Sequence, residues 1–320
     1  MNSTPTWTNG LVDLYVGDTL ASMKTMSDQS VQACVTSPPY WGLRDYGHEG
    51  QIGLEDTPEA YVQRMVEVFR EVRRVLRDDG TLWLNLGDSY NGSGGAGGDG
   101  KQHTNQGSVT RPDNRAGWSG LKHKDLVGIP WRVAFALQSD GWYLRQDIIW
   151  HKPNPMPESV RDRCTKAHEY VFLLSKSEKY YFDTDAVAEP ATYPGDNRAA
   201  RRDTRKEIDP FCKDGGSRAR TGNPTGETRN RRSVWTILTK PYSGAHFAVF
   251  PPELPRLCIA ASTKHGDTVL DPFGGSGTTG MVATEMGRKA VLCELNPDYA
   301  EIIKGRVNVT PGLALDTSPE

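Results

Sequence analysis

The chain has 320 residues and a mass of 35.4 kDa, which is enough to bury a sizeable core in one large domain or in a domain with an insertion. Its formal net charge is -2, so no net positive field points to a polyanionic partner. Only the local distribution of charge can show whether the chain has a surface for such a partner. The five widely spaced cysteines contain no C-x-x-C pair and the histidines are scattered, which argues against a disulfide framework and a metal site. No apolar run approaches the roughly 18 residues of a membrane span, so we expect a cytoplasmic protein without membrane contact.

The amino-terminal part predicts strands that alternate with helices. A short helix through Met26 is expected between the first two strands. Apolar residues at helical spacing predict an amphipathic helix over Pro58–Arg77, with Thr57 as its N-cap and Asp78-Asp79-Gly80 as its end. A strand, a helix and a strand at this spacing form a βαβ unit. The expected strands are Leu11–Val16, Val31–Thr36 and Thr81–Leu86.

Two irregular regions interrupt this pattern. Six of the nine residues from Gly92 to Gly100 are glycine, and a polar tract follows, so residues 91–125 are predicted to form a mobile loop. From Asp196 to Arg232 there are eleven basic and six acidic residues, which gives a local charge of +5 within a chain of net charge -2. A solvated loop and a phosphate-contacting surface both fit such a tract.

Regular elements return between and after these regions. Helices are expected over Pro130–Gln138 and Pro251–Ser262, and a third helix is expected to end at Met286. The expected strands are Tyr143–Trp150, Glu169–Leu174, Thr268–Leu270 and Lys289–Cys293. The domain organisation predicted from these features consists of a catalytic half at 1–90 and 126–185, the loop 91–125, a basic region at 186–234, a second half at 235–309 and a tail at 310–320.

A glycine-rich turn follows the expected strand Thr268–Leu270. Gly275, Gly277 and Gly280 match the pattern G-x-G-x-x-G, and Glu294 lies 19 positions after Gly275 at the end of the next strand. A turn with little side chain lets a nucleotide approach the backbone, and an acid at that spacing binds ribose hydroxyls. No Gly-Lys-Ser/Thr follows, which excludes a Walker loop. Taken alone, the pattern also fits a dinucleotide-dependent oxidoreductase, so it does not identify the nucleotide.

A second motif, Ser37-Pro38-Pro39-Tyr40, directly follows the expected strand Val31–Thr36. The two prolines stiffen the turn and remove two N–H donors, so the carbonyls of the turn are expected to be free to accept from another group. The Ser37 oxygen and the Pro38 carbonyl form a pair of acceptors suited to the two hydrogens of an exocyclic amino group, and Tyr40 offers a flat face for stacking. Without a nucleotide site in the same chain, an ordinary proline turn would explain the motif equally well.

Together, Ser37-Pro38-Pro39-Tyr40 and the segment from Asp271 to Thr279 resemble the paired motifs of DNA amino-methyltransferases that use S-adenosylmethionine (SAM). Their order in the chain resembles the β group of that family, and the resemblance spans roughly Leu11 to Val307 apart from the two irregular regions. It implies an α/β fold with a doubly wound, mostly parallel, seven-stranded Rossmann-like sheet and irregular DNA-recognition insertions. The strands at Val269 and Val291 are then expected beside the amino-terminal strands.

The resemblance also implies residue roles. Asp271, Phe273 and Gly275 match the motif that cradles the methionine part of the cofactor, and Glu294 matches the acid that binds its ribose. Asp18 resembles the residue near the cofactor adenine, and the segment His246-Phe247-Ala248-Val249-Phe250-Pro251 completes that pocket. The expected cofactor-binding residues are Asp18, Thr36, His246, Phe247, Phe250, Asp271, Pro272, Phe273, Gly274, Gly275, Ser276, Gly277, Thr278 and Glu294.

Ser37, Pro38, Pro39 and Tyr40 are the expected catalytic residues. Ser37 stands where adenine-methylating relatives commonly have Asp, and Phe250 stands where many have Lys, which favours N4 of a flipped-out cytosine in double-stranded DNA. N6 of adenine is the alternative within the family, and a dinucleotide-dependent oxidoreductase is the remote one. A companion restriction endonuclease, the recognition sequence and the oligomeric state stay open. The candidate DNA contacts in the basic region are Arg201, Arg202, Arg205, Arg231 and Arg232.

Overall fold

The computed structural model describes residues 4–43, 47–91, 120–191, 227–239 and 250–308. The chain divides into two compact units, one formed by Met1–Tyr181 with Ser233–Glu320 and the other by Phe182–Arg232. In the described part of the chain, no helix is long and apolar enough to cross a membrane. Most of the predicted loop 91–125 lies outside the described residues, as do five candidate site residues. These five are Arg201, Arg202, Arg205, His246 and Phe247.

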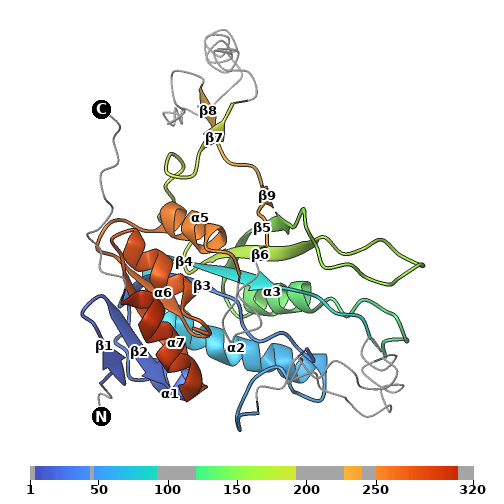
Figure 1. Ribbon diagram of the computed structural model, residues 1–320, viewed down its shortest axis with the longest axis horizontal. Helices are drawn as coiled ribbons and strands as arrows, with labels where there is room; N and C mark the ends of the chain where they lie inside the picture. The colour runs from blue at the N-terminus through green and yellow to red at the C-terminus, as the bar shows by residue number, and fades with distance from the viewer. Residues whose placement is uncertain (1–3, 44–46, 92–119, 192–226, 240–249, 309–320) are drawn as a thin grey trace, which may run out of the picture. The chain divides into compact units, whose positions relative to one another are not determined.

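The larger unit is built on a sheet of nine strands in the order β1-β2-β11-β10-β3-β4-β6-β5-β9 (Figure 1). Strands β2, β11, β10, β3 and β4 are parallel, whereas β6 runs antiparallel to both of its neighbours. The seven strands from β2 to β5 form the expected mostly parallel sheet, and the short strands β1 and β9 extend its two edges. The strands are β1 (Trp7–Thr8), β2 (Val12–Val16), β3 (Val31–Thr36), β4 (Leu76–Leu86), β5 (Tyr143–His151), β6 (His168–Ser175), β9 (Val234–Thr236), β10 (Thr268–Asp271) and β11 (Lys289–Glu294).

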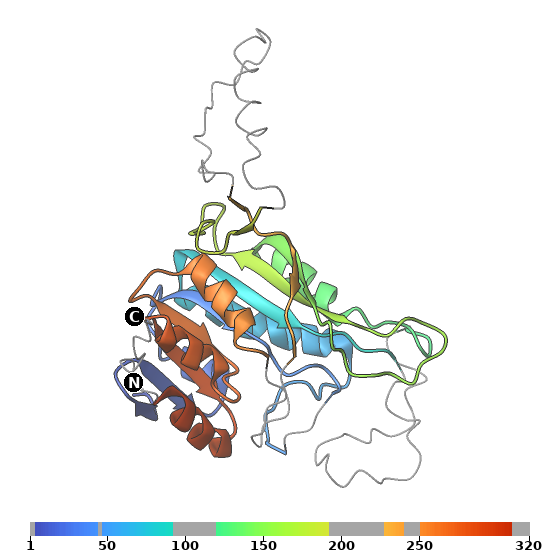
Figure 2. The same cartoon turned by 45° about the horizontal axis from the view of Figure 1, so that its top comes forward.

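Helices cover both faces of this sheet, which confirms the doubly wound α/β fold. Figures 1 and 2 show α5, α6 and α7 along one face and α2 and α3 along the other. Helix α2 begins with Pro58 at its first position, and the Thr57 hydroxyl accepts a hydrogen bond from Ala60 N at 3.1 Å. Its apolar stripe, including Tyr61 and Phe69, is fully buried. The helices are α1 (Thr19–Met23), α2 (Pro58–Val75), α3 (Ile129–Ser139), α5 (Glu253–Ser262), α6 (Thr278–Glu285) and α7 (Pro297–Val307).

The end of α2 differs from the sequence prediction. The helix stops at Val75 rather than at Arg77, because Leu76 adopts extended backbone angles (φ -69°, ψ 140°) and already belongs to β4. Leu76 is fully buried and pairs with Val31, whereas the register then shifts so that Thr81 pairs with Ala33. The apolar side chain that extends the helical spacing is therefore buried by the sheet, and Asp78-Asp79-Gly80 lies in the irregular part of a strand.

Helix α7 was absent from the sequence prediction, which stopped at Glu294. Its start carries a clear local signal, since the Asn296 side chain accepts from Asp298 N at 2.8 Å and Pro297 occupies the first position. Near its other end, Arg306 Nη1 donates to Ser276 O (3.0 Å), Ser276 Oγ (2.5 Å) and Thr278 Oγ1 (3.0 Å). The helix thereby anchors the glycine-rich turn.

The position of the site follows from the order of the strands. Strand β3 lies next to β10, with Leu270 opposite Cys34. The next strand along the chain after β3 is β4, which lies on one side of this pair, whereas the next strand after β10 is β11, which lies on the other side. Ligands of open α/β sheets bind beyond the carboxyl ends of the strands at such a switch point. The two motifs, separated by more than two hundred residues, begin at Ser37 and Asp271 on these two neighbouring strands. The expected neighbours β2 beside β11 and β3 beside β10 are confirmed.

The smaller unit contains the two-stranded sheet of β7 (Glu189–Pro190) and β8 (Thr228–Arg229). Within it, Glu189 accepts hydrogen bonds from Arg229 Nε (2.9 Å) and Arg232 Nε (2.7 Å), and Arg231 Nε donates to Val187 O (2.8 Å). Arg231 and Arg232, both candidate DNA contacts, therefore each make hydrogen bonds inside this unit. Their contact with DNA stays a prediction.

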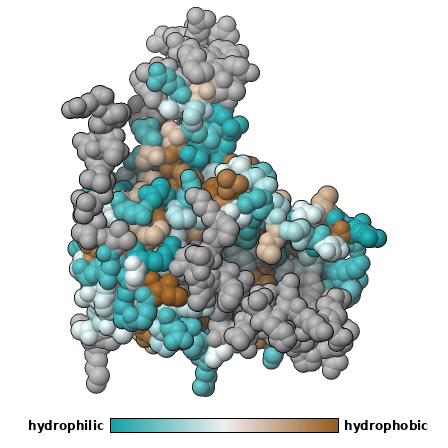
Figure 3. All heavy atoms as spheres, viewed as in Figure 1, coloured by the Kyte–Doolittle hydropathy of each residue, from teal (hydrophilic) through white to brown (hydrophobic). Residues whose placement is uncertain are grey.

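The surface of the described residues is mostly hydrophilic on the face seen in Figure 3, where hydrophobic side chains form small separate patches. Exposed large apolar residues nevertheless include Leu126, Phe135 and Met156, of which Met156 is 86% exposed. Scattered apolar side chains of this kind are normal on a folded protein.

Replacing Arg306 by methionine should lower the free energy of unfolding by about 2 kcal/mol, because two polar side chains and a carbonyl on the turn lose a charged donor. Urea unfolding measures this change. The matched control on the same helix is Lys304→Met, which removes a surface pair with Glu301 and should cost at most about 1 kcal/mol. Equal losses in the two variants would show that Arg306 does not anchor the turn.

Candidate functional site

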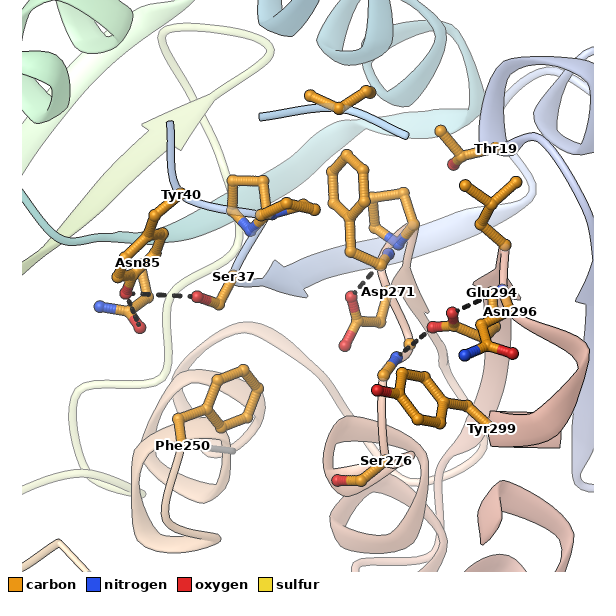
Figure 4. Close-up of a pocket in the computed structure, with 18 of the residues that line it drawn as sticks. Thr19, Ser37, Tyr40, Asn85, Phe250, Asp271, Ser276, Glu294, Asn296 and Tyr299 are labelled. Carbon is orange, nitrogen blue, oxygen red and sulfur yellow. Dashed lines mark hydrogen bonds between the residues drawn. The ribbon is translucent and has the colours of Figure 1, made fainter. Parts of the chain in front are cut away.

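A cavity of about 380 Å³ opens at the carboxyl edge of the sheet in the larger unit. This volume lies in the range of small-molecule sites. Figure 4 shows its two ends: Ser37, Tyr40 and Asn85 gather at one, and Asp271 and Glu294 at the other. The cavity is therefore bordered by both motifs, as their neighbouring strands require.

Glu294 ties the glycine-rich turn to the end of β11. One of its carboxylate oxygens accepts from Gly275 N at 2.7 Å and the other from Asn296 N at 2.9 Å. Each oxygen can accept a further hydrogen bond from a molecule in the cavity. Burial raises the pKa of Glu294 to about 7 despite the two backbone N–H donors, which act to lower it. Glu294 therefore titrates near neutral pH.

Asp271 is buried behind the turn and its carboxylate is held from three sides. Thr36 Oγ1 donates to it at 2.6 Å, Thr279 Oγ1 at 2.7 Å and Phe273 N at 3.1 Å. Burial raises the pKa of Asp271, and these three donors act in the opposite direction. The carboxylate fixes the start of the turn relative to β3.

Two expected cofactor contacts do not line the cavity. Thr36 is 1% exposed and lies behind Asp271, so it supports the turn instead of facing the cavity. Gly277 has φ 79° directly before α6, a conformation that favours glycine, and an added Cβ would come within 3.2 Å of Ile303. Its role is to allow the turn. The remaining described candidates line the cavity, namely Asp18, Phe250, Asp271, Pro272, Phe273, Gly274, Gly275, Ser276, Thr278 and Glu294.

Asp18 has a structural role that the sequence analysis did not identify. Its Oδ1 accepts from Ala21 N at 2.8 Å and caps α1, and its Oδ2 lies 3.8 Å from Arg64 Nη2. The residue follows β2, whose last residue, Val16, pairs with Glu294. Asp18 thus reaches the cavity from the strand beside β11.

At the other end of the cavity, tight packing fixes the Ser37-Pro38-Pro39-Tyr40 turn. The Tyr61 hydroxyl donates to Pro39 O at 2.9 Å, so this carbonyl is already engaged, contrary to the expectation that the carbonyls of the turn are free. The Tyr40 ring lies so close to Gly87 that a Cβ there would be 2.5 Å from its Cε2 atom. All four residues of the motif line the cavity.

Four polar side chains form a network at this end, and the sequence analysis missed three of them. The Tyr40 hydroxyl donates to Glu169 Oε2 at 2.8 Å, and Asn85 Nδ2 donates to the same oxygen at 3.2 Å. Lys152 pairs with the other Glu169 oxygen. Burial and the charge of Glu169 raise the pKa of Tyr40 well above its usual value, so its hydroxyl keeps its proton. No sequence spacing links these residues, which meet because β3, β4, β6 and β5 pair in that order.

Comparisons with known proteins agree with this arrangement. A family model described as DNA methylase matches residues 31–305. The chain is 49% identical over 296 residues to Type II methyltransferase M.SmaI of Serratia marcescens, covering 92% of this chain and 90% of that protein. It is 49% identical over 306 residues to Type II methyltransferase M.Cfr9I of Citrobacter freundii, covering 95% and 90%.

Two solved structures have a similar fold. The cytosine-N4-specific PvuII DNA methyltransferase superposes with a TM-score of 0.63 at 20% identity, covering 97% of this chain and 92% of that one. TTHA0409 from Thermus thermophilus, complexed with S-adenosyl-L-methionine, gives a TM-score of 0.57 at 25% identity and covers 92% of both chains. The chain belongs to the DNA methylase family and is a SAM-dependent DNA amino-methyltransferase.

Proposed function

We propose that this enzyme methylates the exocyclic N4 of a flipped-out cytosine at a specific site in double-stranded DNA. The observation that carries methyl transfer to an exocyclic amino group is the position of Ser37, which borders the same cavity as the cofactor turn but at its opposite end. The serine and Phe250 stand where adenine-methylating relatives commonly have Asp and Lys. A cytosine-N4-specific methyltransferase with the same fold also supports the choice of base.

The cavity fits SAM on the chemistry of its walls. The turn from Asp271 to Gly275 lines the cavity and would hold the methionine part, and Glu294 retains acceptor capacity for ribose hydroxyls. Asp18 and Phe250 would border the adenine. When bound, SAM supplies an electrophilic methyl group on its sulfonium.

The residues of the opposite end prepare the nucleophile. The lone pair of the cytosine amino group is delocalised into the ring, which makes the nitrogen a poor nucleophile. Ser37 Oγ and the Pro38 carbonyl would accept its two hydrogens, favour a pyramidal nitrogen and direct its lone pair toward the cofactor. A base inside a duplex cannot reach these acceptors, so it must leave the stack, and the Tyr40 ring would hold it. No covalent intermediate with the enzyme is needed.

The biological setting follows from the relatives. M.SmaI and M.Cfr9I are Type II methyltransferases, and we infer that this enzyme likewise protects DNA from a restriction endonuclease that reads the same site. A DNA substrate also agrees with the expected cytoplasmic location.

Nucleoside analysis tests the reaction directly. DNA incubated with the enzyme and SAM is digested to nucleosides and analysed by mass spectrometry, and we expect N4-methylcytosine. N6-methyladenine as the product would overturn the choice of base, and the absence of any methylated nucleoside in DNA that contains the target would overturn the function. Methylome sequencing of cells that express the enzyme identifies the site.

Removing the Ser37 hydroxyl should abolish most turnover without changing the affinity for the cofactor. Ser37→Ala should lower kcat by about 100-fold, the typical effect of losing one preorganised polar group, while the Kd for SAM stays unchanged. Tyr40→Ala should also remove most activity, whereas Tyr40→Phe, which keeps the ring, should retain more of it. The exposed Ser139→Ala on α3 is the control for serine replacement. Full activity of Tyr40→Ala would disprove a stacking role for the ring.

The affinity for SAM should depend on pH through Glu294. Its pKa is raised to about 7, so below that pH the carboxyl is protonated and must lose its proton to accept from both ribose hydroxyls. The Kd for SAM should therefore be about tenfold weaker at pH 6 than at pH 8. Isothermal titration calorimetry should give a flat profile for Glu294→Gln and an unchanged dependence for the exposed Glu301→Gln. A pH-independent Kd in the unmodified enzyme would contradict this role.

We also propose that residues 186–234 contact the DNA backbone. Replacing Arg201, Arg202 and Arg205 by glutamine should flatten the dependence of log Kd on log salt concentration by up to about one unit per lost phosphate contact. Fluorescence anisotropy with a duplex containing the target measures it. Lys289→Gln, at the amino end of β11 and on the sheet edge away from the cavity, should leave the slope unchanged. If the salt dependence of the triple variant is unchanged, these arginines do not contact phosphates and the region is a solvated loop.

A further inference from the structure

Lys152 and Glu169 form an ion pair inside the cavity, with side chains only 19% and 16% exposed. They sit at the ends of β5 and β6, where Trp150 pairs with Glu169 and His151 with His168. Removing two charges from water costs free energy that their attraction often fails to offset. A part-buried pair on a cavity wall, beside the proposed acceptors of the amino group, therefore points to a role in recognition.

The network leaves the ammonium little freedom of position. Both Glu169 oxygens are engaged, one by Lys152 and the other by Tyr40 and Asn85. Lys152 Nζ also lies 4.2 Å from the ring centroid of Trp150, whose indole N–H donates to Ile237 O at 3.0 Å. Trp150 is 3% exposed and is therefore a fixed platform.

The ammonium has more donors than the described residues use. A lysine ammonium carries three N–H donors, and among the described residues Glu169 is the one acceptor that hydrogen-bonds it. The group lines the cavity, where a ligand can supply the acceptors that it lacks. A charge-assisted hydrogen bond to a neutral carbonyl is stronger than a neutral one.

Lys152 belongs to the same hydrogen-bonded network as Ser37. A chain of three contacts joins Ser37 Oγ to Tyr40 OH (3.5 Å), Tyr40 OH to Glu169 (2.8 Å) and Glu169 to Lys152. The edge of cytosine presents the amino group at one end, the ring nitrogen N3 next and the carbonyl O2 at the other. Adenine has an amino group and N1 in the same order, but a C–H where cytosine has O2.

We propose that Lys152, oriented by Glu169, donates a hydrogen bond to O2 of the target cytosine while the amino group of the base is held at Ser37. The pair then selects cytosine, because adenine in the same pose would leave a buried ammonium donor opposite a C–H. Sites that hydrogen-bond a substrate group reject analogues that lack it, since their own polar groups are left unpaired. The inference rests on the proposed N4-cytosine function and names the residue that determines the base.

The decisive experiment is a double-mutant cycle between the residue and the atom. Enzyme with Lys152 or Lys152→Met acts on duplexes that carry either cytosine or a 2-aminopyridine C-nucleoside at the target, the analogue keeping the amino group and ring nitrogen but lacking O2. We expect loss of O2 to lower kcat/KM by at least about tenfold in the unmodified enzyme and by less than about threefold in Lys152→Met. If removal of O2 lowers kcat/KM by the same factor in both enzymes, the residue and the atom act independently and the proposal is overturned.

A second analogue separates O2 from the neighbouring ring nitrogen. 3-Deazacytosine keeps O2 and lacks N3, so its effect should be the same in both enzymes. Coupling of Lys152 to N3 in place of O2 would overturn the proposal, because adenine offers an equivalent nitrogen. The same cycles are measured as equilibrium Kd values for the duplexes, which need no turnover if Lys152→Met is inactive.

Control variants distinguish recognition from folding. Lys166→Met removes a neighbouring lysine that donates to Asp88 O at 3.1 Å, and it should leave the O2 dependence intact. Lys152→Arg, which keeps a cationic donor, should retain a larger O2 dependence than Lys152→Met.

The methylated nucleoside is identified in parallel. N6-methyladenine would refute the proposed function and this inference together, whereas N4-methylcytosine with uncoupled losses would refute this inference alone.

Discussion

The pairing of β3 with β10 is the constraint on which the site depends. It aligns the end of an amino-terminal strand with the end of a carboxy-terminal one, and the 2.6 Å hydrogen bond from Thr36 to Asp271 joins the two motifs directly. Strand side chains alternate between faces, so a register slip of one residue would turn Thr36 away from Asp271. Neither motif could place a nucleophile opposite a cofactor without this alignment.

Three carboxylates on the cavity wall share one feature: each is surrounded by donors that the fold supplies. Asp271 receives two hydroxyls and a backbone N–H, Glu294 receives two backbone N–H groups, and Glu169 receives a lysine, a tyrosine and an amide. Burial still raises the pKa of Asp271 and of Glu294, so these donors do not fully replace water. Perturbed carboxylates grouped around a cavity are typical of functional sites.

Local signals in the sequence identified only those parts of the site that lie close together along the chain. The glycines before α6 and the Ser37-Pro38-Pro39-Tyr40 turn have a characteristic spacing, and the strands that carry them have strong apolar patterns. The end of α2 was misplaced because Leu76 satisfies the helical spacing while the sheet buries it. The Lys152–Glu169 pair was missed because only the antiparallel pairing of β5 and β6 brings the two residues together.

The choice between cytosine and adenine cannot be made at the amino group alone. Both bases present two amino hydrogens to Ser37 and the Pro38 carbonyl, so these acceptors fit either one. Discrimination has to come from the atoms that differ, and on the edge of the base these lie at the end away from the amino group. The turn that activates the amine and the charged pair that would read that far end belong to one hydrogen-bonded network through Tyr40. Activation of the amine and selection of the base are then properties of a single arrangement of side chains.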